Sequence, residues 1–183
     1  MGERPSGDVD LFTDWQRRAD FPQVVDLVIA ALEHNGAGVV IDARTDTFAR
    51  LLVSLGRESS EEPQKVELAA DWRAHPPVIL DVGPVLHADD AVANKMAALY
   101  GRALARDFLD INAVLASERY SSNRLLELAE AADSGFDRAM FSRALGALDQ
   151  ISDDAFAPYD VDRHAIVVLR QRFAQWREEL QHG

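Results

Sequence analysis

Hydrophobic positions change their spacing near the middle of this chain. In the first half, short apolar runs alternate with polar, Gly- or Pro-containing segments, the pattern of strands joined by turns. Phe21–His34 is the exception, because its apolar residues recur at helical spacing, with Pro22 in the first turn and Asn35-Gly36 beyond the last. Gly56–Pro63 reads as a polar hairpin loop. The predicted strands are Val9–Phe12, Val39–Asp42, Phe48–Leu55, Lys65–Leu68 and Val78–Val82.

From residue 89 onward the apolar pattern is helical throughout. Asp89 and Asp90 are suitable N-caps for the first of these helices. The sequence therefore predicts an α+β protein, with a strand-rich core over residues 1–88 and a helical region over residues 89–183 packed on it. The predicted helices are Ala91–Leu104, Arg106–Ala116, Leu125–Ala132, Arg138–Leu148 and Arg163–Leu180. We expect the aromatic residues of this half, Phe141, Phe156, Phe173 and Trp176, to form its core.

Composition narrows the class of protein. The chain has 183 residues, 48% of them hydrophobic, which is enough to bury a core. It contains no cysteine, which excludes disulfides, thiolate metal sites and a cysteine nucleophile. The net charge of -12 argues against non-specific coating of nucleic acid, although a local basic patch could still dock one. With neither a signal-peptide pattern nor an apolar run of about 20 residues, the sequence predicts a cytoplasmic protein that does not enter the membrane.

Three acidic residues on predicted strands suggest a metal site. Asp8 and Asp10 lie two residues apart, so a strand would place both carboxylates on one face. Glu67 alternates with Val66 and Leu68, and it would join them if the two strands are neighbours. Three such carboxylates could hold magnesium ions and activate a hydroxyl for attack on a phosphate. Each alone would more often be a solvated acid, and Asp71 is a weaker substitute for Glu67.

A second group of charged residues follows on the predicted helices. Lys95, one of two lysines in the chain, lies beside an apolar helix face, and Arg102 shares its side of the helix two turns later. Both could bind a phosphate, Lys95 as a point charge and Arg102 as a guanidinium. Asp107 and Asp110 share a face of the next helix, where they could orient these cations or simply favour the helix dipole. The five histidines show no metal-ligand spacing, and His87, just before the helix of Lys95, is the only one with a suggestive position.

Taken together, these segments resemble the AbiEii-type nucleotidyltransferases, the toxin family that includes the MenT toxins. The resemblance covers roughly residues 4–115 and is most specific in the last two of its four segments. In order, these segments are the D-x-D strand Arg4–Phe12, the third-carboxylate strand Lys65–Leu68 with Glu for the commoner Asp, the lysine helix Asn94–Tyr100 and the R-D-h-x-D-h segment Arg106–Ile111.

The resemblance implies a polymerase-beta-like nucleotidyltransferase core, a small mixed sheet with helices, followed by a helical half. It implies magnesium-dependent transfer of a nucleotide from a nucleoside triphosphate (NTP) to an acceptor, which is a tRNA end for some members, and a separate antitoxin protein. Asp8 and Asp10 would then hold the metal, Glu67 would complete the site as the base, and Lys95, Arg102 and Asp110 would bind phosphate or nucleotide.

In one respect the sequence departs from this family. The family carries a Gly-Gly or Gly-Ser element on a helix before the D-x-D strand, and it helps to hold the triphosphate. Here seven residues precede Asp8. We therefore expect this form to be weakly active or inactive, and an N-terminally extended form to be more active and more stable.

Two other readings stay open from the sequence. One is a degenerate nucleotidyltransferase fold that serves as a binding or interaction protein without catalysis. The other is a D-x-D phosphatase of the haloacid dehalogenase type, which fits less well because its D-x-D follows an apolar strand. Here Pro5-Ser6-Gly7 precede Asp8 and the apolar residues follow it.

Overall fold

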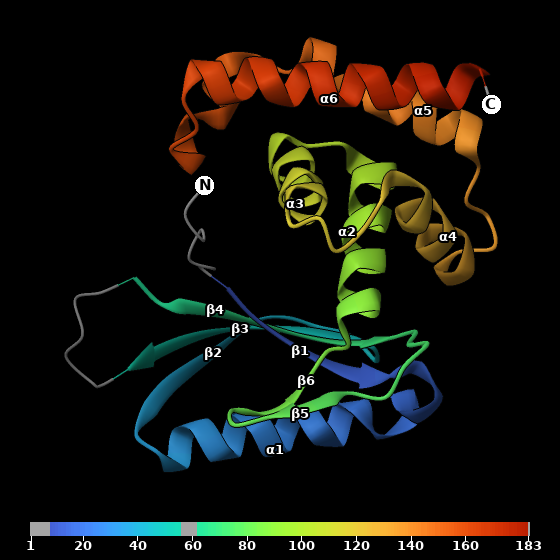
Figure 1. Cartoon of the computed structure of the whole chain (residues 1–183). Helices are drawn as coiled ribbons and strands as arrows, with labels where there is room; N and C mark the ends of the chain where they lie inside the picture. The colour runs from blue at the N-terminus through green and yellow to red at the C-terminus, as the bar shows by residue number, and fades with distance from the viewer. Residues whose placement is uncertain (1–7, 56–61, 183) are drawn as a thin grey trace. The chain divides into compact units, whose positions relative to one another are not determined.

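The computed structural model describes residues 8–55 and 62–182, with the side chains of Asp8 and Leu55 left aside. Internal contacts divide the chain into two units, residues 1–73 and 74–183, and each is described by itself (Figure 1). The sequence predicted a boundary after residue 88, where the apolar periodicity changes. The structure places the boundary after residue 73, so the segment that contains a short two-stranded ribbon, residues 78–85, belongs to the second unit. The start of the D-x-D segment, residues 4–7, and most of the predicted hairpin loop lie outside the described residues.

The first unit is a four-stranded mixed sheet with one long helix. Its strands run in the order β1-β4-β3-β2, with β1 parallel to β4 and the other neighbours antiparallel. The helix predicted over Phe21–His34 is confirmed, and the strands are confirmed with longer bounds for β1, β2 and β4. The elements are β1 (Asp8–Asp14), the 3-10 helix η1 (Trp15–Asp20), α1 (Phe21–His34), β2 (Ala37–Arg44), β3 (Phe48–Leu55) and β4 (Gln64–Asp71).

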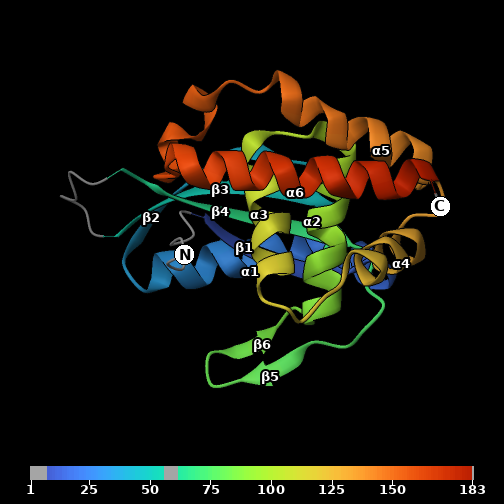
Figure 2. The same ribbon diagram turned by 45° about the horizontal axis from the view of Figure 1, so that its top comes forward.

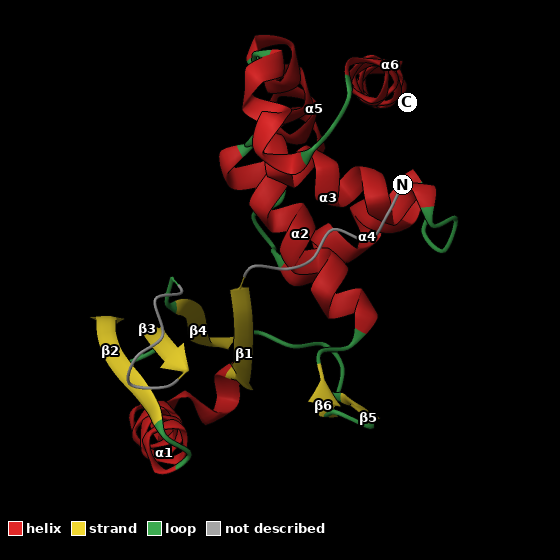
Figure 3. Ribbon diagram, turned by 90° about the vertical axis from the view of Figure 1, so that its left-hand side faces the viewer, coloured by secondary structure: helices red, strands yellow, loops and turns green. Residues whose placement is uncertain are grey.

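Helix α1 lies on one face of this sheet (Figure 3). Every second residue of β4, namely Val66, Leu68 and Ala70, is buried in a cluster that includes Phe21 and Val25 of α1. Burying such side chains contributes about 1.5–3 kcal/mol each for the larger ones, so this cluster fixes which way the sheet faces. The intervening residues of β4 consequently point to the opposite face.

The second unit is helical apart from its ribbon (Figure 2). Its core is rich in aromatic residues, as expected. Phe108 meets Phe173 edge-on, and Phe141 meets Trp176 in the same way. The elements are β5 (Val78–Leu80), β6 (Gly83–Val85), α2 (Ala88–Arg102), α3 (Ala105–Ala116), α4 (Ser122–Ala132), α5 (Arg138–Gly146), the 3-10 helices η2 (Ala147–Gln150) and η3 (Asp153–Tyr159), and α6 (Arg163–His182).

Two local predictions for this unit were wrong. Asp89 and Asp90 do not cap α2, because the helix begins at Ala88 and the Nδ1 atom of His87 accepts the Asp89 N–H at 3.2 Å. The predicted strand Val78–Val82 is confirmed over Val78–Leu80 (β5), but its end was wrong, because the chain turns after Leu80 and β5 pairs antiparallel with β6. Gly83 has a φ of 109°, a conformation that glycine tolerates best, and it allows the chain to turn there.

One ion pair in this unit gives a pH-dependent prediction. Arg138 donates from Nε to Glu130 Oε1 at 2.5 Å, and this hydrogen bond holds the pKa of Glu130 below its ordinary 4.5. A carboxyl group whose pKa is lowered on folding stabilises the folded state at pH values above its pKa in the unfolded state. This stabilisation is lost as the pH falls through its pKa in the folded state. We expect Arg138→Gln to raise the Glu130 pKa toward its ordinary value in an NMR titration. The change in stability should be small, because both side chains are well exposed. An unchanged Glu130 pKa would contradict this.

Candidate functional site

Two of the three predicted metal-binding carboxylates belong to neighbouring strands of the first unit. Asp10 of β1 and Glu67 of β4 are direct partners in the parallel register. Strands in a sheet lie about 4.8 Å apart, and directly opposed residues of a parallel pair point to the same face. That face is the one opposite α1, because Val66 and Leu68 take the α1 side. The backbone of Asp8 pairs with Lys65, while its side chain lies outside the description.

Glu67 is also flanked by basic residues. On its other side, Arg50 of β3 is its register partner and donates from Nε to Oε1 at 2.8 Å. The Nζ atom of Lys65 lies 3.6 Å from the same oxygen, and Arg50 reaches Asp42 of β2 at 3.4 Å. The hydrogen bond to Glu67 raises the pKa of Arg50, which stays charged. Across the strands, this sheet face thus carries two neighbouring acids, Asp10 and Glu67, followed by Arg50 and then Asp42.

Asp71, the substitute considered for Glu67, has a local role at the end of β4. One carboxylate oxygen accepts the N–H of Trp72 at 2.8 Å, and the other lies 3.2 Å from Arg73. Its register partner on β1 is Asp14, the last residue of that strand. These contacts fix the chain as it leaves the sheet.

In the second unit, the predicted nucleotide-binding residues form two separate contacts. Lys95 of α2 donates from Nζ to Asp110 Oδ2 of α3 at 2.9 Å, and both side chains are partly exposed. The acid at position 110 therefore orients the lysine, one of the two roles suggested for it. These residues and the carboxylate pair belong to different units, each described by itself.

Arg102, in contrast, holds together the turn between α2 and α3. Its Nε and second guanidinium nitrogen contact both oxygens of Asp107, the shortest contact being 2.7 Å. Asp107 is buried and also accepts the N–H of Leu104 at 3.0 Å. Between them, Ala103 has a left-handed φ of 47° that ends α2. Asp107 thus orients Arg102, one of the roles suggested by the sequence, and it also caps α3, which the sequence did not indicate. Arg102 has a structural partner beside any role in phosphate binding.

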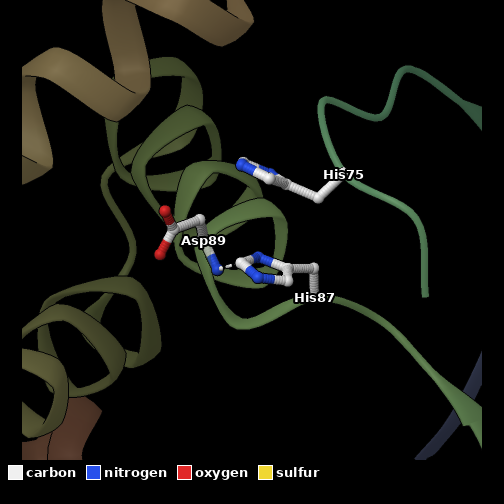
Figure 4. A group of neighbouring side chains, drawn as sticks. All are labelled: His75, His87 and Asp89. Atoms are coloured by element: carbon white, nitrogen blue, oxygen red, sulfur yellow. Dashed lines mark hydrogen bonds between the residues drawn. The ribbon is translucent and has the colours of Figure 1, made fainter. Parts of the chain in front are cut away.

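A further group was not predicted. His75, His87 and Asp89 place one ligand atom each within 4.8 Å of one another, close enough that they could hold a metal ion (Figure 4). The two imidazole rings are stacked, with centroids 4.2 Å apart. His75 escaped notice because the two histidines lie twelve positions apart and neither spacing nor periodicity connects them. The pairing of β5 with β6 does, since it folds the chain back between them.

Asp89 in this group is oriented by two donors. The Tyr120 hydroxyl donates to Oδ1 at 2.8 Å, and Arg124 donates to Oδ2 at 2.9 Å. These hydrogen bonds, that of Tyr120 first, lower the pKa of Asp89. Burial and the adjacent carboxylate raise the pKa of Tyr120, which stays a donor at neutral pH. Asp89 is therefore a fixed anion.

The fold places this chain among proteins with the nucleotidyltransferase fold. Two Helicobacter pylori structures are similar to it. JHP933 has a TM-score of 0.50 and 18% sequence identity, and the match covers 98% of this chain and 78% of that one. A protein described as a candidate nucleotidyltransferase has a TM-score of 0.51 and 17% identity, and the match covers 95% of this chain and 80% of that one. At these identities the likeness concerns the fold. The model of a family described as the nucleotidyl transferase AbiEii toxin of type IV toxin–antitoxin systems matches residues 1–182, and the chain belongs to this family.

Two further findings concern related proteins and membrane-spanning helices. No curated protein shows significant similarity to the chain. Within residues 8–55 and 62–182, none of the helices combines the length and hydropathy that crossing a membrane requires. The resemblance read from the sequence is confirmed by the family match.

Proposed function

We propose that this protein is a metal-dependent nucleotidyltransferase that transfers a nucleotide from an NTP to an acceptor, with a tRNA end as the first acceptor to test. The observation that carries the proposal is the direct pairing of Asp10 with Glu67 on the sheet face opposite α1. Family membership supports the reaction class and implies a separate antitoxin as partner. As a toxin that acts on nucleotides, it would work in the cytoplasm.

Asp10 and Glu67, with Asp8 beside them along β1, are the residues that we propose to hold magnesium. Their carboxylate oxygens suit this hard cation, which is usually bound by one or two carboxylates together with substrate phosphates. When bound, the ion would neutralise charge on the reacting phosphate. Both contacts of Glu67 with Arg50 and Lys65 use Oε1. Arg50 would accordingly orient the carboxylate and present Oε2 to the metal, from which position Glu67 would also accept a proton from the attacking hydroxyl.

Lys95, Arg102 and Asp110 are the proposed nucleotide-binding residues of the second unit. The ammonium of Lys95 is a compact charge suited to a phosphate oxygen. Asp110, 2.9 Å away, would hold it in place. Arg102 would add a weaker, auxiliary attraction, since its guanidinium already contacts Asp107.

The decisive experiment is transfer of label from each of the four NTPs to total tRNA by the purified protein. Product should form with magnesium and should not form when the metal is chelated. Labelling of protein or of DNA in place of tRNA would keep the reaction class and change the acceptor. This form is expected to transfer weakly, so the absence of transfer to any acceptor both by this form and by a folded, N-terminally extended form would contradict the proposal.

Lys95→Ala should lower NTP affinity or turnover and leave folding nearly intact. Lys95 is partly exposed, and a surface substitution usually changes stability by no more than about 0.5 kcal/mol. Labelled-NTP transfer and thermal unfolding measure the two effects. An exposed arginine offers a charge-matched control, because Arg163→Ala removes one positive charge from the second unit away from the proposed nucleotide-binding residues. Equal activity of Lys95→Ala and the parent would exclude the phosphate-binding role.

The second candidate is a binding protein that keeps the fold without catalysis. It is favoured by the contacts of Glu67, whose charge is already balanced by Arg50 and Lys65. In that case NTP binding should be independent of magnesium. Equilibrium binding of a non-hydrolysable NTP analogue with and without the ion separates the two candidates.

A further inference from the structure

Three side chains with metal-binding atoms lie close together at the start of the second unit: His75, His87 and Asp89 (Figure 4). We propose that this His75–His87–Asp89 cluster binds a transition-metal ion of the zinc class. It is independent of the proposed magnesium site, because all three residues belong to residues 74–183 and the carboxylate pair to residues 1–73.

The backbone brings the cluster together through the ribbon. Val78 pairs with Val85, so the residues just before β5 and just after β6 meet at the same end of the hairpin. His75 comes from the first segment, His87 from the second, and Asp89 from the opening turn of α2. The paired ribbon therefore brings the two segments together, and Asp90 anchors the bend at Ala74 and His75 by accepting their backbone N–H groups, which restricts the entropy lost when an ion is bound.

His75 is oriented as metal-binding histidines commonly are. Its Nδ1 lies 3.2 Å from Oδ1 of Asp90, which is buried and also accepts the backbone N–H groups of Ala74 and His75. A carboxylate surrounded by donors accepts the Nδ1 proton, and this tautomer places the lone pair on Nε2. A carboxylate behind a histidine in this way fixes the ring and raises its basicity toward a metal.

The charges around the cluster favour a cation. Asp89 is held by Tyr120 and Arg124, and its oxygens have further lone pairs for an ion. Arg124 is balanced by Asp89 and by Glu127, 3.0 Å away. With Asp90 included, the surroundings of the cluster hold three carboxylates and one guanidinium. This surplus of negative charge also outweighs the positive end of α2, which would otherwise disfavour a cation.

Binding requires two local adjustments. Ligand atoms around a tetrahedral zinc ion lie about 3.3 Å apart, given bonds of about 2.0 Å, so the three side chains must close from their present separation of up to 4.8 Å. His87 must also release the Asp89 N–H that its Nδ1 accepts. Both changes are side-chain rotations of partly exposed groups.

The ligand set selects the kind of ion. Two imidazole nitrogens and one carboxylate oxygen suit zinc and its neighbours in the first transition row, whereas magnesium prefers oxygen ligands. Three protein ligands leave one position for water. The bound ion would crosslink the segment that leads into the ribbon to the first turn of α2 and would stabilise the start of the second unit.

The test is a calorimetric titration of the chelator-treated full chain with Zn²⁺ in excess Mg²⁺, which occupies sites made of oxygen alone. We expect one equivalent of Zn²⁺ to bind. His75→Gln keeps an N–H for Asp90, and His87→Ser keeps a capping oxygen for Asp89, and each should weaken binding at least about tenfold. His164→Gln, at an exposed histidine of α6, and Asp10→Asn should bind Zn²⁺ as the parent does.

A second measurement needs no variant. In NMR spectra of the parent, Zn²⁺ should shift the imidazole signals of two of the five histidines, those of His75 and His87. Shifts confined to other histidines would overturn the proposal. Equal Zn²⁺ affinity in the parent and both cluster variants, or no stoichiometric binding, would overturn it as well.

Discussion

Asp10→Asn is expected to reduce magnesium-dependent nucleotide transfer by about a thousandfold, or about 4 kcal/mol of transition-state stabilisation. Asparagine keeps the size of the side chain and removes the charge that binds the ion. The strand itself should tolerate the change, because Asp10 lies on an edge strand and on the sheet face away from the α1 core. Steady-state transfer assays over a range of magnesium concentrations measure the loss.

Two further variants make this result specific. Glu67→Gln removes the partner carboxylate and keeps an amide oxygen for Arg50, and it should be about as inactive as Asp10→Asn. Asp46→Asn removes one negative charge from an exposed position in the β2–β3 turn of the same unit and should leave activity unchanged. Transfer at the parental rate by both Asp10→Asn and Glu67→Gln would show that the carboxylate pair is not the metal site.

Asp107→Ala should lower the free energy of unfolding by about 2–3 kcal/mol, the largest effect that we expect from a single polar residue of the second unit. The substitution removes the hydrogen bond that caps α3, worth about 1 kcal/mol, and the charge-assisted bonds with Arg102. The partly exposed Arg102 can be hydrated afterwards, which keeps the loss below that for a fully buried pair.

Denaturant unfolding of Asp107→Ala, Asp107→Asn and Asp110→Asn tests the origin of this effect. Asp107→Asn keeps an oxygen for the Leu104 N–H and should lose less. Asp110→Asn changes an acid on the same helix whose side chain is partly exposed, so it should cost no more than about 1 kcal/mol. Equal losses at positions 107 and 110 would mean that Asp107 does not hold the turn as the contacts indicate.

Periodicity was enough to predict the elements with a long or strongly alternating apolar pattern. Helix α1, with Pro22 at its start and Asn35 after its end, and the alternation of Val66, Leu68 and Ala70 on β4 are examples. The order of strands was beyond it, because the parallel pairing of β1 with β4 depends on contacts between residues more than fifty positions apart. Glu67 could be selected from its strand pattern, but its place beside Asp10 was conditional on the two strands being neighbours, which the pattern alone does not decide.

The wrongly predicted cap of α2 has a local cause, competition between neighbouring polar groups. At the start of α2, His87, Asp89 and Asp90 lie close together in the sequence, and each could cap the helix. The sequence does not show that His87 takes this role, while Asp90 accepts the N–H groups of Ala74 and His75. Aspartates are the commoner caps, so propensity pointed to the wrong residue. Recognition of the β5–β6 hairpin would have placed His75 beside His87 and identified the cluster.

The position of β4 between β1 and β3 has a consequence for synthesis on the ribosome. β2 and β3 can form a hairpin as soon as both have emerged, whereas β1, which is made before them, pairs among the described strands only with β4, which follows later. Until then β1 is an unpaired strand, the kind of segment that chaperones bind. An interrupted nascent chain that ends before β4 carries Asp10 without Glu67. Such a fragment would carry a risk of misfolding and would lack the carboxylate pair on which the proposed activity depends.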